Sequence, residues 1–136
     1  MARVITGTIE IPGDQLSAYL QALEDVEQAT APFRTQLEHL NRAFERSLQA
    51  RFSARTARKH ASIIELFINF ICWHTDVRSI DEITRGMANS YFRKWYRSKT
   101  GEGTDAELKT AVKRFFQYLA TEHGITNEAV LKRFNR

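Results

Sequence analysis

Three absences limit what this chain can be. A single cysteine, Cys72, among 136 residues cannot form an internal disulfide. There is no run of eighteen apolar residues and no charged, apolar and small-residue pattern at the N-terminus, so neither a membrane span nor a secretory signal is predicted. The four histidines and the cysteine never form closely spaced ligand pairs, so no metal and no cofactor is expected. The sequence predicts a soluble, cytoplasmic protein.

Catalytic motifs are also lacking. Gly101 and Gly103 have neither the spacing nor the preceding strand of a phosphate loop. The segment "HLNR" contains His39 and Arg42, and the chain has four tyrosines, which together imitate a DNA strand-transfer site. A tyrosine nucleophile needs several cationic donors around the phosphate and a general acid, whereas this pair lies in an acidic stretch. The chain is therefore not expected to be an enzyme.

Large apolar residues and an uneven charge distribution are present instead. Apolar residues make up 43% of the chain, including nine Phe and two Trp, which favours one packed domain over a disordered chain. Residues 1–50 hold four basic and seven acidic residues, whereas residues 51–136 hold sixteen and nine. The net charge of +4 therefore comes from the C-terminal part. Such a balance suits a polyanion, either nucleic acid or an anionic membrane surface, although basic surfaces also serve solubility.

Apolar spacing predicts mostly helix. Helices are expected over about residues 14–31, 33–52, 53–74, 84–96, 104–123 and 127–134, with Ile64, Phe67, Ile71, Val112, Phe115 and Leu119 in one core. The opening "RVITGTIEIPG" alternates as a short strand or an extended arm would. The predicted fold is an all-α, compact bundle of four to five helices over residues 37–136, preceded by a strand and helix extension over residues 1–36.

Start and stop signals define several of these helices. Ser53 and Thr104 are expected to cap the helices that follow them, and Glu107 completes a capping box with Thr104. Gly124 provides a left-handed stop, and Pro32 is expected to end or restart a helix. Asp14 and Thr126 are further predicted caps. For the helix near residue 84 two starts compete, namely Thr84 and the capping box "SIDE" at 79–82.

Two of the predicted helices pair an apolar face with a basic stripe. In residues 53–74, Arg55, Arg58 and Lys59 occupy the polar face at its N-terminal end. In residues 104–123, Lys109, Lys113 and Gln117 lie opposite the apolar face and are flanked by Thr110 and Arg114. Because the apolar faces turn inward, both basic stripes are expected on the surface.

Residues 37–127 resemble the core-binding, SAM-like N-terminal domain of the phage integrase or tyrosine recombinase family. The resemblance rests on the order and spacing of three elements, which are Ser53, Thr56, His60, Ile64, Phe67 and Phe70; Ile80, Ile83 and Thr84; and Thr110, Ala111, Val112, Lys113, Phe115, Phe116, Tyr118 and Leu119. His60 replaces a usual tyrosine, and Asn127-Glu128 replaces the usual Asn-Pro. No catalytic domain of the family follows in this chain.

The resemblance implies a half-clamp that grips one side of double-stranded DNA, with the helices at 53–74 and 104–123 across the major groove. Its implied DNA-binding residues are Arg55, Thr56, Arg58, Lys59, Lys109, Thr110, Lys113, Arg114 and Gln117. It also implies a role in DNA recombination or integration, without catalysis by this chain. End helices in the family contact neighbouring subunits, so the N-terminal segment and the terminal helix are candidates for self-association or for a recombinase partner.

The alternative is a helical protein interaction module that no longer binds DNA. In that case the acidic N-terminal segment or the terminal helix would dock another protein. Duplex DNA binding and its salt dependence distinguish the two hypotheses.

Overall fold

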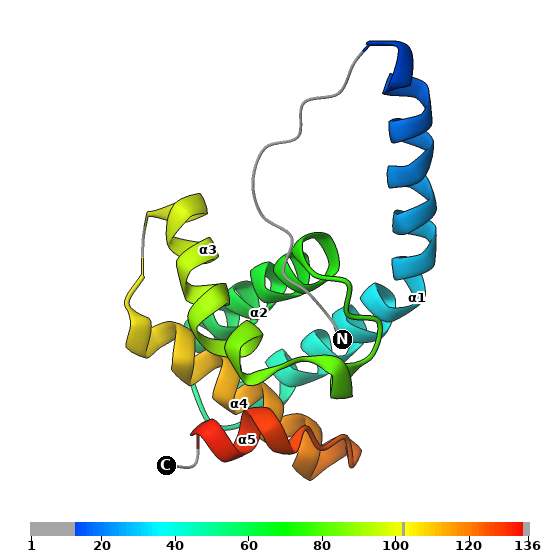
Figure 1. The fold of residues 1–136 in the computed structure, drawn as a ribbon. Helices are drawn as coiled ribbons and strands as arrows, with labels where there is room; N and C mark the ends of the chain where they lie inside the picture. The colour runs from blue at the N-terminus through cyan, green and yellow to red at the C-terminus, as the bar shows by residue number, and fades with distance from the viewer. Residues whose placement is uncertain (1–12, 102, 135–136) are drawn as a thin grey trace.

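The computed structural model describes residues 13–101 and 103–134, with side chains described through residue 131. These residues contain helices and no β-strand, so the all-α prediction is confirmed. Five α-helices follow one another (Figure 1), with one 3-10 turn before the first helix and one 3-10 turn and one π-helical turn between the second and the third. Their bounds are η1 Gly13–Gln15, α1 Leu16–Gln49, α2 Ala54–His74, η2 Ile80–Glu82, η3 Met87–Tyr91, α3 Phe92–Thr100, α4 Asp105–His123 and α5 Glu128–Phe134. The predicted strand at residues 4–11 lies outside the described residues.

Helix α1 is longer than the sequence predicts. It runs without interruption for 34 residues and contains Pro32, so the prediction that this proline ends or restarts a helix was wrong. Proline removes one backbone hydrogen bond and crowds the carbonyl four residues earlier, which kinks a helix but need not end it. Figure 1 shows α1 changing direction in its middle, between an upper half that projects and a lower half that lies along the bundle. The boundary predicted between residues 36 and 37 falls inside this helix.

The start of α1 also differs from expectation. Asp14 lies in the 3-10 turn η1 and is not the cap of α1. Gln15 occupies the N-cap position and makes no side-chain capping hydrogen bond. The amides at this helix end therefore lack the capping that the sequence pattern indicated.

The caps of α2 and α4 are as predicted. Ser53 accepts a hydrogen bond from the amide of Thr56 at 3.1 Å, and Thr104 accepts one from the amide of Glu107 at 3.1 Å. Gly124 ends α4 with a φ of 64°, a left-handed conformation that glycine adopts without a steric penalty. Both helices consequently begin and end at defined residues, which fixes the register of their basic stripes.

The two competing helix-start signals, "SIDE" at 79–82 and Thr84, each begin a helical segment. Glu82 accepts hydrogen bonds from the amide of Arg78 and the hydroxyl of Ser79, which holds the η2 turn. Thr84 then accepts from the amide of Met87 at 3.2 Å and starts the next helical segment. That segment opens with the π-helical turn η3, where the ring of Tyr91 lies so close to Gly86 that an added Cβ would meet it at 3.2 Å.

The core is built from α2 and α4, which are covered by the lower half of α1. All six residues predicted for it are buried, and the rings of Phe44 and Phe115 meet edge to face at 5.3 Å between α1 and α4. Burying such aromatic side chains is the main source of stability in a domain of this size. The core prediction is confirmed.

The last helix is tied to the middle of the chain by Asn127. The side-chain nitrogen of Asn127 donates to the carbonyls of Ile80 at 2.8 Å and Ile83 at 2.9 Å. Its side-chain oxygen accepts from the backbone amide of Val130 at 3.1 Å. Asn127 therefore performs the capping role predicted for Thr126, because its buried amide satisfies both the helix end and the η2 turn.

Candidate nucleic-acid interface

The basic end of α2 lies beside α4. The two helices pack against each other through their apolar faces, which leaves the polar faces of both along one side of the contact. Ile63 of α2 and Ala111 of α4 are buried, whereas polar residues of both helices line the edge of their contact. The polar residues along this edge are thereby brought together.

A cavity of about 340 Å³ opens between the two helices. It is lined by three of the predicted site residues, Thr56, Lys59 and Thr110, together with His60, Ile63, Ala106 and Glu107. Lys59 Nζ lies 3.1 Å from a Glu107 carboxylate oxygen, so an ion pair bridges the helices at this point. Both side chains are well exposed, and such surface pairs contribute little stability and exchange partners readily.

Arg114 is the most firmly positioned cation of this surface. Its guanidinium donates to His60 Nε2 at 2.8 Å and lies 4.6 Å from the centroid of the Phe52 ring. The His60 ring stacks on Phe52, and its Nδ1 lies 3.1 Å from the carbonyl oxygen of Thr56. Because a guanidinium can only donate and a carbonyl can only accept, His60 carries its proton on Nδ1.

The environment keeps His60 neutral. Burial lowers the pKa of His60, and the nearby positive charges of Arg114 and Lys59 lower it further, against the opposing hydrogen bond to Thr56. A neutral imidazole can accept the hydrogen bond from Arg114 without offsetting its charge. The charge of Arg114 is therefore positioned but not neutralised.

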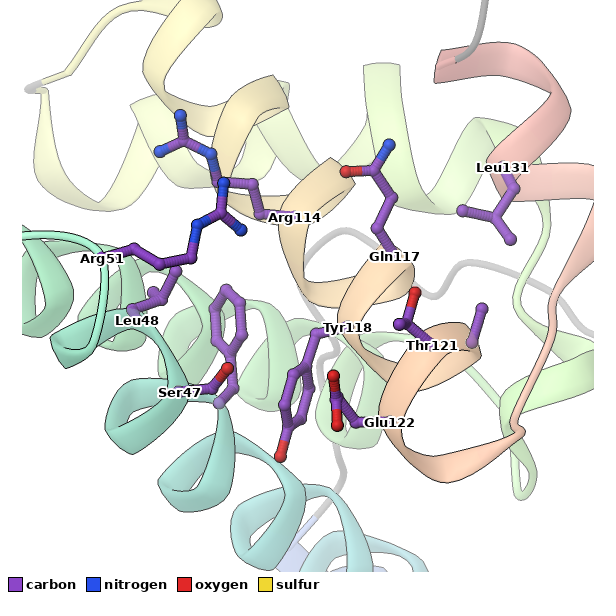
Figure 2. Close-up of a pocket in the computed structure, with 11 residues that line it drawn as sticks. Ser47, Leu48, Arg51, Arg114, Gln117, Tyr118, Thr121, Glu122 and Leu131 are labelled. Carbon is purple, nitrogen blue, oxygen red and sulfur yellow. The ribbon is translucent and has the colours of Figure 1, made fainter.

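A second cavity, of about 410 Å³, lies between the end of α1, α4 and α5 (Figure 2). Figure 2 shows Arg51 and Arg114 at one end of it and Glu122 beside Tyr118 at the other. Arg51 lies 5.4 Å from the centroid of the same Phe52 ring that supports Arg114. Gln117 also lines this cavity, one turn along α4 from Arg114. Two guanidinium groups thus share one aromatic support.

The nine predicted residues do not all lie together. Thr56, Lys59, Thr110, Arg114 and Gln117 line the two adjoining cavities. Arg55 and Lys109 are exposed on the same two helices, and Lys113 is half-buried on α4.

Arg58 is directed elsewhere. Its guanidinium lies 3.3 Å from Glu45 of α1 and 3.8 Å from Glu65, on the side of α2 that faces α1. Two neighbouring carboxylates offset its charge. One step along a helix turns a side chain by about 100°, which separates Arg58 from Lys59.

Sequence reasoning missed Arg51 and Phe52. Both were included in the helix predicted over residues 33–52, but α1 ends at Gln49 and they lie in the short turn before α2. The adjacent basic and aromatic residues were the available signal, since arginine stacks readily on aromatic rings. His60, which the resemblance places where the family usually has a tyrosine, is half-buried and holds Arg114 in place.

The features that imitate a catalytic site are dispersed. His39 and Arg42 are exposed on α1, and burial and the nearby Glu122 raise the pKa of Tyr118, which lies at the other end of the second cavity. Within the described residues, no three His, Cys, Asp or Glu side chains are grouped as metal ligands would be. The helices described here are also too short or too polar to cross a membrane.

Together the fold and this surface define an all-helical domain with a cationic surface built on α2, α4 and the turn before α2. No protein-family model, curated protein or solved structure matches the chain.

Proposed function

We propose that the chain is a non-catalytic DNA-binding module that grips one side of the duplex with α2 and α4. The observation that carries the proposal is the grouping, on α2, α4 and the turn before α2, of five cations that have no carboxylate partner among the described residues, namely Arg51, Arg55, Lys109, Lys113 and Arg114. The resemblance to the SAM-like core-binding domain of tyrosine recombinases supports the same two helices and extends the proposal to a role in DNA recombination.

Positioned arginines suit the phosphate backbone. A guanidinium offers several donors in one plane and binds phosphate oxygens in pairs, which favours Arg51 and Arg114 as phosphate ligands. Their stacking on Phe52 restricts both side chains before binding, so less side-chain entropy is lost when a phosphate arrives. This pair is the proposed centre of the contact.

The surrounding residues extend the contact along both helices. Lys59 can leave Glu107 for a phosphate, and Lys109 and Lys113 add charge on α4. Thr110 and Gln117 offer neutral donors and acceptors able to reach base edges. Since most of these groups are cationic, phosphate contacts are expected to dominate the affinity, and sequence preference is expected to be modest.

Fluorescence anisotropy with a labelled duplex at several salt concentrations tests this function. Each phosphate contact adds about one unit to the slope of the logarithm of affinity against the logarithm of salt. We expect Lys113→Ala to weaken binding to all sequences alike and to lower that slope by about one unit.

Arg85→Ala is the control for that substitution. Arg85 is exposed beside Asp81 and Glu82, at a cavity formed by residues 81–86 and Ala129 that shares no residue with the two cavities of the proposed interface. Its removal should leave the slope unchanged. Equal losses from Lys113→Ala and Arg85→Ala would place DNA on another face.

Absence of binding at low salt would favour the alternative, a helical protein interaction module. A covalent adduct between the chain and a nicked duplex, lost when one tyrosine is replaced, would contradict a non-catalytic role. Neither outcome depends on the target sequence of the DNA.

A further inference from the structure

The projecting half of α1 carries an uncovered apolar face. Leu16, Leu20, Leu23 and Val26 are between 39% and 54% exposed, which is unusual for four large apolar residues on one short stretch of helix. Leu16, Tyr19, Leu23, Val26 and Thr30 are spaced alternately by three and four residues. The same spacing continues into the buried residues Phe33, Leu37, Leu40 and Phe44. The apolar face of α1 thus extends beyond the bundle that covers its lower half.

The charges of this half lie mostly outside the apolar face. Between residues 13 and 33 there are four acidic residues and no basic one. Asp25 lies on the opposite side of the helix, and Ala22 and Ala29 form one edge of the apolar face. Glu24 and Glu27 lie at the other edge, one and two turns from Leu20. Apolar spacing of this kind is typical of helices that pair in coiled coils.

A groove opens where the projecting half meets the bundle. Its volume is about 390 Å³, and its lining combines Val26, Ala31, Cys72 and Trp73 with the polar residues Gln28 and Thr30 and the charged residues Glu24, Glu27 and Arg34. Trp73 is 46% exposed. The hydroxyl of Thr30 and one guanidinium nitrogen of Arg34 are buried there without a hydrogen-bond partner among the described residues. The groove therefore combines exposed apolar surface with two unpartnered polar atoms.

We propose that two copies of the chain pair through these helices in antiparallel orientation, with Leu23 at the centre. The projecting stretch of residues 16–30 is about 22 Å long at 1.5 Å per residue, so its tip reaches the groove of the second copy. Such a contact is symmetric, and each tip covers the other copy's Trp73 and Thr30. A parallel pair would leave both grooves uncovered.

The groove that receives the tip carries charges of both signs. It is lined by Glu24 and Glu27 together with Arg34, whereas Asp25 points away from the contact. In the antiparallel pair, Glu27 of one copy faces the Leu20 region of the other. Because each copy contributes one short helix and one groove, the interface is at the small end for protein complexes, and a dissociation constant in the micromolar range, about 1 to 100 μM, is expected.

Sedimentation equilibrium of the full chain without DNA, over about 1 to 200 μM, tests the pairing. We expect a monomer–dimer equilibrium that Leu20→Glu with Leu23→Glu weakens at least tenfold. The control, Ser17→Glu with Gln21→Glu, adds the same charge at exposed residues that lie outside the apolar face and do not line the groove, and it should dimerise as the unchanged chain does. A monomer throughout this range, or equal loss from both double variants, would overturn the proposal.

Cysteine cross-linking tests the orientation. A disulfide requires Cα atoms within about 7 Å, a condition that the central Leu23→Cys pair meets and the distant Leu16→Cys pair does not in an antiparallel dimer. Cross-linking of Leu16→Cys with itself would show a parallel pair and contradict the arrangement. Since no DNA is present, these results stand or fall independently of the DNA-binding proposal.

Discussion

The two halves of α1 have the same apolar spacing and opposite surroundings. In the lower half, Leu37 and Phe44 are almost completely buried against α2 and α4. In the upper half, Leu20 and Val26 remain about half exposed. One continuous helix thus contributes to the core along one part of its length and presents an equivalent face to solvent along the other.

This contrast shows what helical periodicity determines. The spacing of apolar residues fixes which side of a helix is apolar, because side chains three and four apart share a face. It does not determine what covers that face. Coverage depends on the length and direction of the other helices, and α2 passes beneath only the lower half of α1 in this fold (Figure 1).

The largest test of the contrast compares a covered residue with an exposed one. Phe115 is fully buried and meets Phe44 of α1 edge to face, so Phe115→Ala should lower the free energy of unfolding by about 3–5 kcal/mol. Leu23→Ala in dilute protein should lower it by less than about 0.5 kcal/mol, because the side chain already contacts water. Urea titration followed by circular dichroism measures both. Similar losses would mean that the upper half is covered in the folded monomer.

A second test concerns the junction between the halves. Replacing Pro32 by Ala restores an amide that can bond to the carbonyl of Gln28, and a proline inside a helix costs about 3 kcal/mol relative to alanine. We expect slower amide hydrogen exchange around residues 28–32, with a smaller effect on the core. If Pro32→Ala instead destabilised the core, the change of direction in α1 would be required for its lower half to pack.

The smallest expected effect is a pH dependence of stability that comes from His60, in the packed part of the molecule. Burial lowers the pKa of His60 in the folded chain, so the unfolded chain binds the proton more tightly. The contribution to stability is therefore complete above the unfolded pKa of about 6.5 and is lost as pH falls from there through the lower folded pKa. The free energy of unfolding, measured by denaturant titration over about pH 5 to 8, should therefore fall as the pH is lowered. His60→Gln should remove it.

Much of the fold was predictable because its signals are local. Ser53, Thr104 and Gly124 act within one helical turn, and each is used as predicted. The predictions for Pro32 and Thr126 were wrong because packing outweighed local preference, whereas Asp14 lies in an exposed turn and its miss has no packing explanation. Packing of the lower half of α1 keeps the helix intact past its proline, and the buried Asn127 can reach two carbonyls far away in the sequence as well as its own helix end.

The candidate site was predictable only in outline. Periodicity separated the basic stripes from the core, but it grouped Arg58 with Lys59 although only Arg58 faces carboxylates of α1 and α2. The aromatic support of Arg114 was also hidden from it, because Phe52 lies in a turn and contacts a residue 62 positions later. Contacts between distant segments decide which cations are offset and which are held ready for an anion.

Cys72 gives this molecule its own reporter of local opening. The thiol is the only one in the chain and is buried beside the groove at the base of the projecting helix, where burial raises its pKa. A protonated, covered thiol does not react with alkylating reagents, so labelling has to wait until α1 and α2 separate. The rate at which an added thiol reagent modifies Cys72 thus measures local opening between α1 and α2, without any engineered probe.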